Sequence, residues 1–456
     1  MFSFGSAADP IGKFGLTELS ARLMAEGGAG KSSYEEIVKK LFPYAAKVEW
    51  QIDREQIAFV LRLPSEGVGV GYAILLDLLK SPQFQTNDFE RVKMQMLSNL
   101  QSELKGSDEE SLGKELLQAF LYEKHPYGHP SVGHVKDLKN ITIDDVKAHY
   151  SRWFCSNNLT VGLTGSIPST LLRHVREDFT SWNTKSCQGL GQRPLQRNSG
   201  RRIILVEKPD AKAIAVSMGF TLPITRAHPD FASLKLASSY LGEHRQFVGS
   251  LMQAVREKRG LNYGDYAYAE HFEQQSWTRF AKSHLGRHQQ YFSVWLRPLD
   301  PKRAVFAVRL AVRELERLTS QGLNEQEVQR MKHFLVNYYA LFSQSASEKL
   351  AQALDAKFYA MEENIYSSLI RQWKALGKQE INKNIKKYFD LKNLQIVMIV
   401  PKAAPVIQEL LAASQQSPSY PGAQPKSLLQ EDVAIRNFSL NISKEDIRVL
   451  GLDAVF

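Results

Sequence analysis

Apolar residues recur every three or four positions in several stretches of the chain, with polar residues between them. This spacing is close to the 3.6-residue period of an α-helix, so each stretch presents one apolar face to a core. Thr142, followed by Asp144 and Asp145, is typical of a helix start, because a side-chain oxygen caps free N–H groups and acids favour the positive end. The spacing predicts helices over Leu16–Glu26, Tyr34–Phe42, Gly71–Leu79, Asp88–Leu104 and Ile143–Ser151.

Other stretches are short and rich in β-branched and aromatic residues, which either alternate with polar residues or form brief apolar runs. Runs of this kind are typical of β-strands. Because helical and strand-like stretches are interspersed along the chain, the pattern predicts an α+β fold. The predicted strands are Ile57–Leu63, Leu159–Thr164, Arg202–Val206, Ile214–Phe220, Tyr291–Arg297 and Leu394–Val400.

Two segments of the first half resemble two segments of the second half, in the same order and at nearly the same offset. Ile74–Lys93 matches Arg313–Lys332 at an offset of 239 positions. Ile143–Leu163 matches Lys378–Met398 at an offset of 235 positions. A duplicated unit explains both matches. We therefore expect two similar domains, each a mostly antiparallel sheet packed with helices.

A polar segment without any hydrophobic period separates the two halves. Residues 183–200 are rich in Gly, Gln, Asn and Ser, which is typical of an interdomain linker. The sequence thus predicts an N-terminal domain over residues 1–182 and a C-terminal domain over residues 201–456. Two predicted strands precede the first helix of the second half, but only Met1–Gly5 precedes Leu16. We expect the first domain to lack one or two N-terminal strands.

Composition and charge narrow the function classes only slightly. The 456 residues are 43% hydrophobic and 23% charged, an ordinary balance for a globular protein. A net charge of +10 permits an acidic partner or substrate but does not indicate nucleic acid. No apolar run approaches the roughly 18 residues that a transmembrane helix needs. Cys155 and Cys187 allow one disulfide, and the sequence leaves open whether they pair.

Several motifs resemble the pitrilysin or insulinase family of zinc metallopeptidases, which includes the mitochondrial processing peptidases. They are Gly15–Met24 (GLTELSARLM), His125–Gly133 (HPYGHPSVG) and Val255–Tyr263 (VREKRGLNY). The resemblance covers nearly the whole chain and is greatest to bacterial non-catalytic, inactive-domain members. It implies a fold like that of the processing peptidases, in agreement with the α+β prediction.

The resemblance also shows which groups this chain lacks. Active members carry H-x-x-E-H on a helix, in which two histidines hold zinc and the glutamate is the general base. The positions that match the first histidine, the base and the second histidine are Glu18, Ala21 and Arg22. The distant glutamate ligand is replaced by Ser98 or Asn99. We expect no metal in this chain, and an ion pair between Glu18 and Arg22, four residues apart on one helix.

Two further residues, Arg256 and Tyr263, match an arginine and a tyrosine that contact the substrate in active family members. The resemblance implies that Tyr263 donates its hydroxyl to the oxygen of the scissile carbonyl and that Arg256 holds a neighbouring peptide carbonyl. These donors act where negative charge develops, opposite the zinc ion. The alternative is an ordinary helix and loop in which Arg256 pairs with Glu257 or another neighbour and Tyr263 packs.

Together these features predict a non-catalytic, substrate-binding subunit of a heteromeric zinc metallopeptidase. A partner chain is expected to supply H-x-x-E-H and the zinc ion, so enzymatic activity is expected only of the complex. The alternatives are a structural or assembly subunit, similar to respiratory-complex core proteins, and a free-standing peptide-binding homodimer. The resemblance also suggests the periplasm or envelope of a Gram-negative bacterium.

Overall fold

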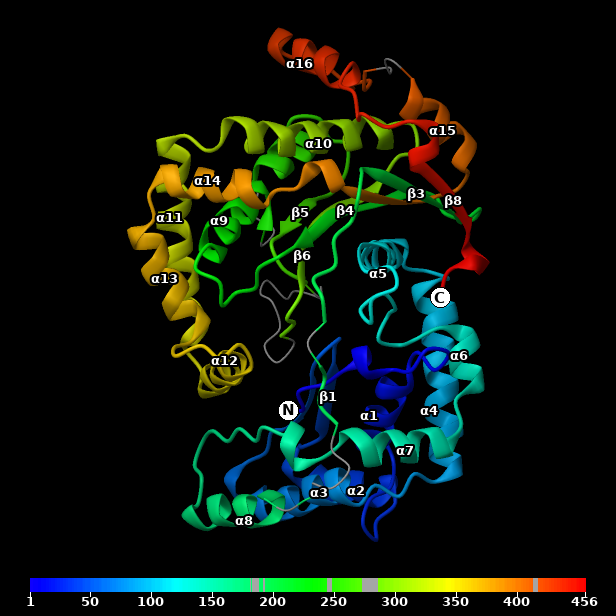
Figure 1. The fold of residues 1–456 in the computed structure, drawn as a ribbon, viewed down its shortest axis with the longest axis vertical. Coiled ribbons are helices and arrows are strands. Elements are labelled where there is room, and N and C mark those ends of the chain that lie inside the picture. The colour runs from blue at the N-terminus through cyan, green and yellow to red at the C-terminus, as the bar shows by residue number, and fades with distance from the viewer. Residues whose placement is uncertain (181, 183–187, 192, 244–247, 273–285, 413–416) are drawn as a thin grey trace.

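The two halves of the chain form two helix-rich bodies that share a packed interface (Figure 1). The structure is a computed structural model, and it describes residues 1–180, 182, 188–191, 193–243, 248–272, 286–412 and 417–456. Helices and strands are interspersed in both halves, so the predicted α+β fold is confirmed. Among the described residues, no helix combines the length and the apolar character that crossing a membrane requires.

The first half is mostly helical. Its core is an apolar cluster in which Phe2, Phe4 and Phe154 pack edge to face, together with Leu19 of α1 and Val92 of α4. The helices are α1 (Leu16–Glu26), α2 (Tyr34–Leu41), α3 (Val68–Lys80), α4 (Thr86–Ser98), α5 (Glu109–Leu121), α6 (Val135–Asn140), α7 (Ile143–Trp153) and α8 (Ser169–Thr180).

The described part of the first half contains one small sheet, an antiparallel hairpin of β1 (Val48–Ile52) and β2 (Ile57–Leu61). The strand predicted over Leu159–Thr164 is wrong. Only Leu159 forms a bridge, with Phe2, and the Thr160 N–H donates to the Met1 carbonyl at 2.8 Å. A strand needs backbone hydrogen bonds to a neighbouring strand along its length. Among the described residues, this segment has such backbone partners only at Leu159 and Thr160.

The second half is built around a six-stranded sheet in the order β5-β6-β4-β7-β3-β8. Three neighbouring pairs are antiparallel, whereas β3 pairs in parallel with both β7 and β8. The strands are β3 (Arg202–Glu207), β4 (Ile214–Leu222), β5 (Asp265–Tyr268), β6 (Gln290–Leu299), β7 (Gln395–Val400) and β8 (Ile447–Gly451).

Helices cover one face of this sheet and enclose the largest apolar cluster. Leu234 of α9, Leu310 of α10 and Ile385 of α14 are fully buried against strand residues such as Val216 and Met398. The helices are α9 (Phe231–Leu241), α10 (Ala304–Gln321), α11 (Glu325–Ala340), α12 (Ala346–Phe358), α13 (Ile365–Ala375), α14 (Lys378–Tyr388), α15 (Ala403–Leu411) and α16 (Lys426–Arg436).

The opposite face of the same sheet is covered by α5, which belongs to the first half (Figure 1). Leu116 and Leu117 of α5 share an apolar cluster with Val206 of β3 and Ile399 of β7. Each buried leucine stabilises this contact by roughly 1.5 to 3 kcal/mol. The two halves are therefore packed together through α5.

The repeated sequence blocks lie on matching elements. In the first half α7 is followed by a 3-10 turn, Ser156–Asn158, and in the second half α14 is followed by a 3-10 turn, Leu391–Asn393. Thr142 caps α7 as predicted and forms a capping box with Asp145. The helix predicted over Asp88–Leu104 is divided, because α4 ends at Ser98 and a π-helical turn follows.

The predicted linker is described only in part. Residues 188–191 and 193–200 form neither helix nor strand, while 183–187 and 192 lie outside the described residues. Cys155 is buried and is not a free thiol. Cys187 lies outside the described residues. The domain boundaries at 182 and 201 stay a prediction.

Candidate functional site

The helix that carries the degenerate motif is α1, and its start is fixed by the residues before it. Gly15 has φ of 100°, in the left-handed region that favours glycine, and a Cβ there would lie 2.7 Å from the Val132 carbonyl oxygen. The Asp9 carboxylate accepts the N–H groups of Gly15 and Thr17, both at 2.7 Å. These contacts set the direction in which the side chains of α1 point.

Arg22 does not pair with Glu18, so this part of the sequence prediction is wrong. The Arg22 Nε lies 3.5 Å from a carboxylate oxygen of Glu26, one turn further along α1. Its guanidinium also lies 5.4 Å from the ring centroid of Trp50, whose indole N–H donates to Glu26 at 3.0 Å. The Trp50 ring and Glu26 both hold the Arg22 guanidinium in place. The charge pattern of α1 alone does not reveal these partners.

The motif positions do not form a zinc-binding set. Ala21 is fully buried and carries no donor atom, and the Arg22 guanidinium has no lone pair for a metal. Ser98 and Asn99 are exposed at the junction of α4 and the π-helical turn. Within the described ranges, no three His, Cys, Asp or Glu side chains are grouped so that they could hold a metal ion. The residues present therefore do not fit zinc.

Glu18 is the acid that remains at this position, and it lies in an unfavourable environment. Its side chain is 9% exposed, and burial raises the pKa of its carboxyl to about 7, against the smaller opposing influence of Arg22. Asp9 and Glu115 act in the same direction as burial, whereas Arg54 opposes them. A carboxylate is costly to bury without a partner, so the neutral and charged forms of Glu18 are comparably populated near pH 7.

Glu18 lines a cavity of about 500 Å³ between the two halves of the chain. From the first half come α1, strand β1, helix α5 and the loop around Ser131; from the second half come β6 and two residues that follow β5, His271 and Phe272. Aromatic side chains from both halves form part of its wall, namely Trp50, Phe272, Tyr291 and Trp295. The cavity therefore combines apolar walls with a small number of charged groups, as ligand sites do.

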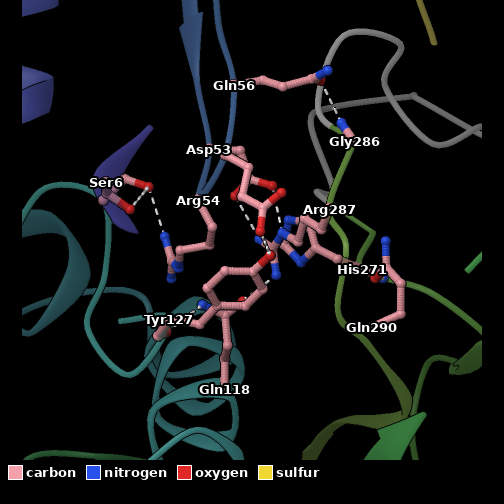
Figure 2. Close-up of polar contacts among 12 residues, drawn as sticks. Ser6, Asp53, Arg54, Gln56, Gln118, Tyr127, His271, Gly286, Arg287 and Gln290 are labelled. Atoms are coloured by element: carbon pink, nitrogen blue, oxygen red, sulfur yellow. Dashed lines mark hydrogen bonds and ion pairs between the residues drawn. The ribbon is translucent and has the colours of Figure 1, made fainter. Parts of the chain in front are cut away.

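A buried polar cluster holds the tip of the β1–β2 hairpin against the second half beside this cavity (Figure 2). Arg287 forms an ion pair with Asp53, and its Nη1 donates to Gln118 at 2.7 Å. Gln56 accepts the N–H of Gly286. Burial raises the pKa of the Asp53 carboxyl, but Arg287, His271 and Arg54 together outweigh it and lower that pKa to about 2.

Two neighbours of Asp53 extend the same cluster. Arg54 donates to Ser131 at 2.6 Å and pairs with Glu115 at 3.0 Å. Glu55 accepts a hydrogen bond from the hydroxyl of Tyr127 and pairs with His288. The hydrogen bond between Glu55 and His288 is the largest influence on the pKa of His288, and it raises that pKa. Sequence reasoning missed the second-half partners because they lie more than 230 positions away.

The structure brings Arg256 and Tyr263 together. Arg256 comes from the π-helical turn Met252–Glu257, and its guanidinium carbon lies 4.7 Å from the ring centroid of Tyr263. Arg256 also pairs with Glu257 at 3.5 Å, as the alternative interpretation expected. Tyr263 is 69% exposed, so it does not pack as that interpretation required.

The loop that presents Tyr263 is held by its own backbone. Gly260 has a positive φ of 58°, and its N–H donates to the Arg256 carbonyl at 2.6 Å. Asn262 donates to Asp265 at 2.7 Å. Burial raises the pKa of the Asp265 carboxyl to about 7, against the lowering effects of Asn262 and Arg256. Neither Arg256 nor Tyr263 belongs to the described lining of the cavity.

Side chains on β6 connect this pair to the cavity. The guanidinium of Arg297 lies 5.8 Å from the ring centroid of Tyr263 and 3.7 Å from Glu110 of α5. Two residues earlier, Trp295 lines the cavity, and the Lys114 ammonium lies 3.9 Å from its ring centroid. Arg297 and Trp295 lie on the same face of β6, so this face extends from the arginine–tyrosine pair to the cavity beside Glu18.

Family models match both halves of the chain. Residues 1–133 match the model described as Insulinase (Peptidase family M16), and residues 140–335 match the one described as Peptidase M16 inactive domain. The chain belongs to the insulinase family of peptidases. The family expected from the sequence motifs is confirmed, and the second half matches the description of an inactive domain.

Relatives in the insulinase family agree with this assignment. The non-peptidase homolog YmxG of Helicobacter pylori is 24% identical over 403 residues, which cover 88% of both chains. A peptidase M16 inactive domain from Pseudomonas fluorescens superposes with a TM-score of 0.76 and 20% identity, over 88% of this chain and 91% of that one. The first half of the periplasmic protease PqqL from Escherichia coli superposes with a TM-score of 0.68 and 11% identity, over 96% of this chain and 90% of that one. The solved structures show that the fold is shared.

Proposed function

We propose that this chain is the non-catalytic, substrate-binding subunit of a heteromeric zinc metallopeptidase. A partner chain carries H-x-x-E-H and the zinc ion, and this chain contributes Arg256 and Tyr263. Its family membership and its unsuitable donor set at Glu18, Ala21 and Arg22 support the first part. The arginine–tyrosine contact supports the second.

The observation that carries the proposal is the exposure of Tyr263 beside Arg256. A tyrosine that served only packing would bury its ring, whereas this ring is 69% exposed and its loop is fixed by Asn262 and Gly260. The exposed phenol is thus held in a defined position. Such an arrangement suits a group that meets a ligand.

The chemistry assigned to the pair is hydrogen-bond donation to a peptide. The Tyr263 hydroxyl donates to the oxygen of the scissile carbonyl as negative charge develops there, and the Arg256 guanidinium donates to a neighbouring carbonyl. Zinc in the partner chain supplies the activated water. Because both donors are fixed before the substrate arrives, they stabilise the charge without reorganising.

The expected compartment is the periplasm or envelope of a Gram-negative bacterium. The similar fold of the periplasmic protease PqqL supports this assignment. Fusion of the full chain to a reporter that is active only outside the cytoplasm would test it. A reporter signal confined to the cytoplasm would contradict it.

Reconstitution tests the division of labour. This chain, a zinc chain carrying H-x-x-E-H from the same organism, and an equimolar mixture of the two are each assayed with an unstructured fluorogenic peptide. The proposal predicts a stable heteromer whose cleavage rate far exceeds the sum of the separate rates. Metal analysis of the heteromer should find zinc in the partner only.

The two alternatives give different results in the same experiment. An assembly subunit forms the heteromer without increasing the rate of cleavage. A free-standing homodimer binds the peptide but does not associate with the zinc chain, as native mass measurement would show. Either result would overturn the proposal.

A further inference from the structure

One carboxylate in the cavity between the halves has no partner among the residues that the structure describes. Glu18 lines the cavity, is 9% exposed, and neither accepts a hydrogen bond nor forms an ion pair within 4 Å in the described part of the chain. The backbone of α1 fixes its position, because Gly15 and Thr17 are anchored on Asp9. A buried, unpaired carboxylate at a cavity wall is a group prepared for a cationic ligand.

The cations near Glu18 are engaged with other carboxylates. Arg22 pairs with Glu26, and Arg54 pairs with Glu115 and donates to Ser131. Each of these arginines therefore has its charge balanced by an acid other than Glu18. A further positive charge in the cavity meets a carboxylate that none of the described residues neutralises by direct contact.

A third cation at the cavity wall is engaged in the same way. Lys114 of α5 pairs with Glu110 at 2.8 Å and lies over the ring of Trp295. Lys114 lines the same cavity as Glu18, but its ammonium group is held by Glu110 and Trp295, and burial lowers its pKa more than Glu110 raises it. It does not supply the missing partner of Glu18.

The aromatic walls are suited to a positive charge. Trp50 already has the Arg22 guanidinium over its ring, and Trp295 has the Lys114 ammonium over its ring at 3.9 Å from the centroid. Both rings also line the cavity. Cations over an indole gain electrostatic stabilisation that increases where water is excluded.

The size and donor set of the cavity indicate an organic cation rather than a metal ion. Two of the three carboxylates in the lining, Asp53 and Glu115, are already paired with Arg287 and Arg54. Glu18 alone is too few for a divalent metal, and no group of three candidate ligands occurs among the described residues. A volume of about 500 Å³ accommodates a long side chain together with part of its backbone.

We propose that this cavity binds the positively charged side chain of a lysine or arginine in the peptide, with Glu18 as its ion-pair partner. This inference rests on the proposed function, since it names the class of peptide that the subunit selects. The position that matches a zinc-binding histidine in active relatives thus serves here to recognise an ammonium or guanidinium group. Glu18 determines specificity and takes no part in bond cleavage.

Matched peptides test the proposal on the full-length chain, alone and in the heteromer. Three fluorescently labelled peptides differ at one central position, which is arginine, lysine or citrulline, the neutral isostere of arginine. Binding is measured by fluorescence anisotropy for the wild type, for Glu18→Gln and for Glu90→Gln. Glu90 is exposed on α4, so its substitution removes the same charge away from the cavity.

The expected result is a preference for charge that depends on Glu18. The arginine and lysine peptides bind roughly 10- to 100-fold more tightly than the citrulline peptide, as expected for a charge-assisted hydrogen bond. Glu18→Gln removes this preference and leaves the citrulline peptide unaffected. Glu90→Gln retains the preference.

Three results would overturn the inference, and they separate it from the proposed function. Equal binding of the three peptides, or a preference that survives in Glu18→Gln, refutes the role of Glu18. If the heteromer still cleaves these peptides in a Tyr263-dependent way, the proposed function stands. If none of the peptides binds to the chain or to the heteromer, both proposals fail.

Discussion

At the scale of single residues, the degenerate motif has acquired new contacts. Arg22, at the position of the second histidine, is held by Trp50 and Glu26 and stabilises the outer part of α1. Glu18, at the position of the first, has no partner among the described residues, and burial disfavours its charged form. A residue retained at a cost in stability is typical of a functional site.

Glu18→Gln should therefore stabilise the chain in a pH-dependent way. The folded pKa of about 7 exceeds the ordinary glutamate pKa of 4.5, so the folded state binds the proton more tightly. The free energy of unfolding therefore falls as the pH rises between these values. Relative to wild type, we expect Glu18→Gln to gain about 2 to 3 kcal/mol at pH 8 and almost nothing at pH 4. Urea unfolding at both pH values measures the difference.

Glu90→Gln is the matched control for this prediction. Its side chain is exposed on the neighbouring helix α4, so we expect a change within about 0.5 kcal/mol at either pH. Equal stability of Glu18→Gln and wild type at pH 8 would mean that the carboxylate has a partner in solution.

The sequence predicted which residues replace the zinc motif, but it did not predict their partners in the folded protein. Motif spacing was sufficient to identify Glu18, Ala21 and Arg22 as the altered positions, since zinc ligands need fixed side chains on one helix face. It could not identify the partner of Arg22, because Trp50 lies on a separate strand and the choice depends on tertiary packing. Asp53 and Arg287 are 234 positions apart, and no local pattern connects them.

At the scale of elements, sequence patterns predicted most helices and strands, and one predicted strand is absent. The bounds of α1 agree with the prediction at both ends, because its apolar residues repeat at helical spacing and Gly15 precedes them. The Leu159–Thr164 segment has the composition of a strand, yet it pairs only with Met1–Ser3 among the described residues. Strand formation depends on a partner that composition does not reveal.

Gly15 should be more sensitive to substitution than Gly12, although both have a positive φ. A Cβ at Gly12 meets nothing within 4 Å, whereas one at Gly15 lies 2.7 Å from the Val132 carbonyl oxygen. Gly12→Ala should cost about 1 kcal/mol from backbone strain alone, and Gly15→Ala at least about 2 kcal/mol more. Thermal unfolding of the two variants tests this difference. Equal midpoints would show that α1 shifts freely at its start.

At the scale of the whole molecule, the two halves are joined in two ways. Helix α5 of the first half fills one face of the second half's sheet, and the β1–β2 hairpin tip is clamped by Arg287 (Figures 1 and 2). The cavity beside Glu18 lies between these two contacts and takes residues from both halves. Its shape therefore depends on how the halves are held together.

Loss of the buried cation at the clamp should destabilise the protein strongly. Arg287→Met leaves the Asp53 carboxylate buried without its counter-charge, which should cost about 3 to 5 kcal/mol at neutral pH. Because the folded pKa of Asp53, about 2, lies below the ordinary aspartate pKa of 3.8, the stabilisation is present above pH 3.8 and disappears as the pH falls to about 2. The difference between wild type and Arg287→Met should shrink over the same range.

An exposed ion pair provides the comparison for Arg287. Arg173 and Glu177 on α8 lie 3.8 Å apart and are mostly exposed, so Arg173→Met should cost less than about 1 kcal/mol. Combining Arg287→Met with Asp53→Asn should recover part of the loss, because no unpaired charge then remains. Losses of equal size in Arg173→Met and Arg287→Met would contradict the proposed clamp.

The most direct test of the central claim is the turnover number of the reconstituted heteromer with Tyr263→Phe in this chain. If the Tyr263 hydroxyl stabilises charge on the scissile carbonyl, its removal should lower kcat by roughly 100-fold or more while zinc content and heteromer formation stay unchanged. Tyr34→Phe, at a partly exposed tyrosine of α2, should leave kcat unaltered. A Tyr263→Phe heteromer that cleaves peptide at the wild-type rate would contradict the claim that this chain takes part in the peptidase site.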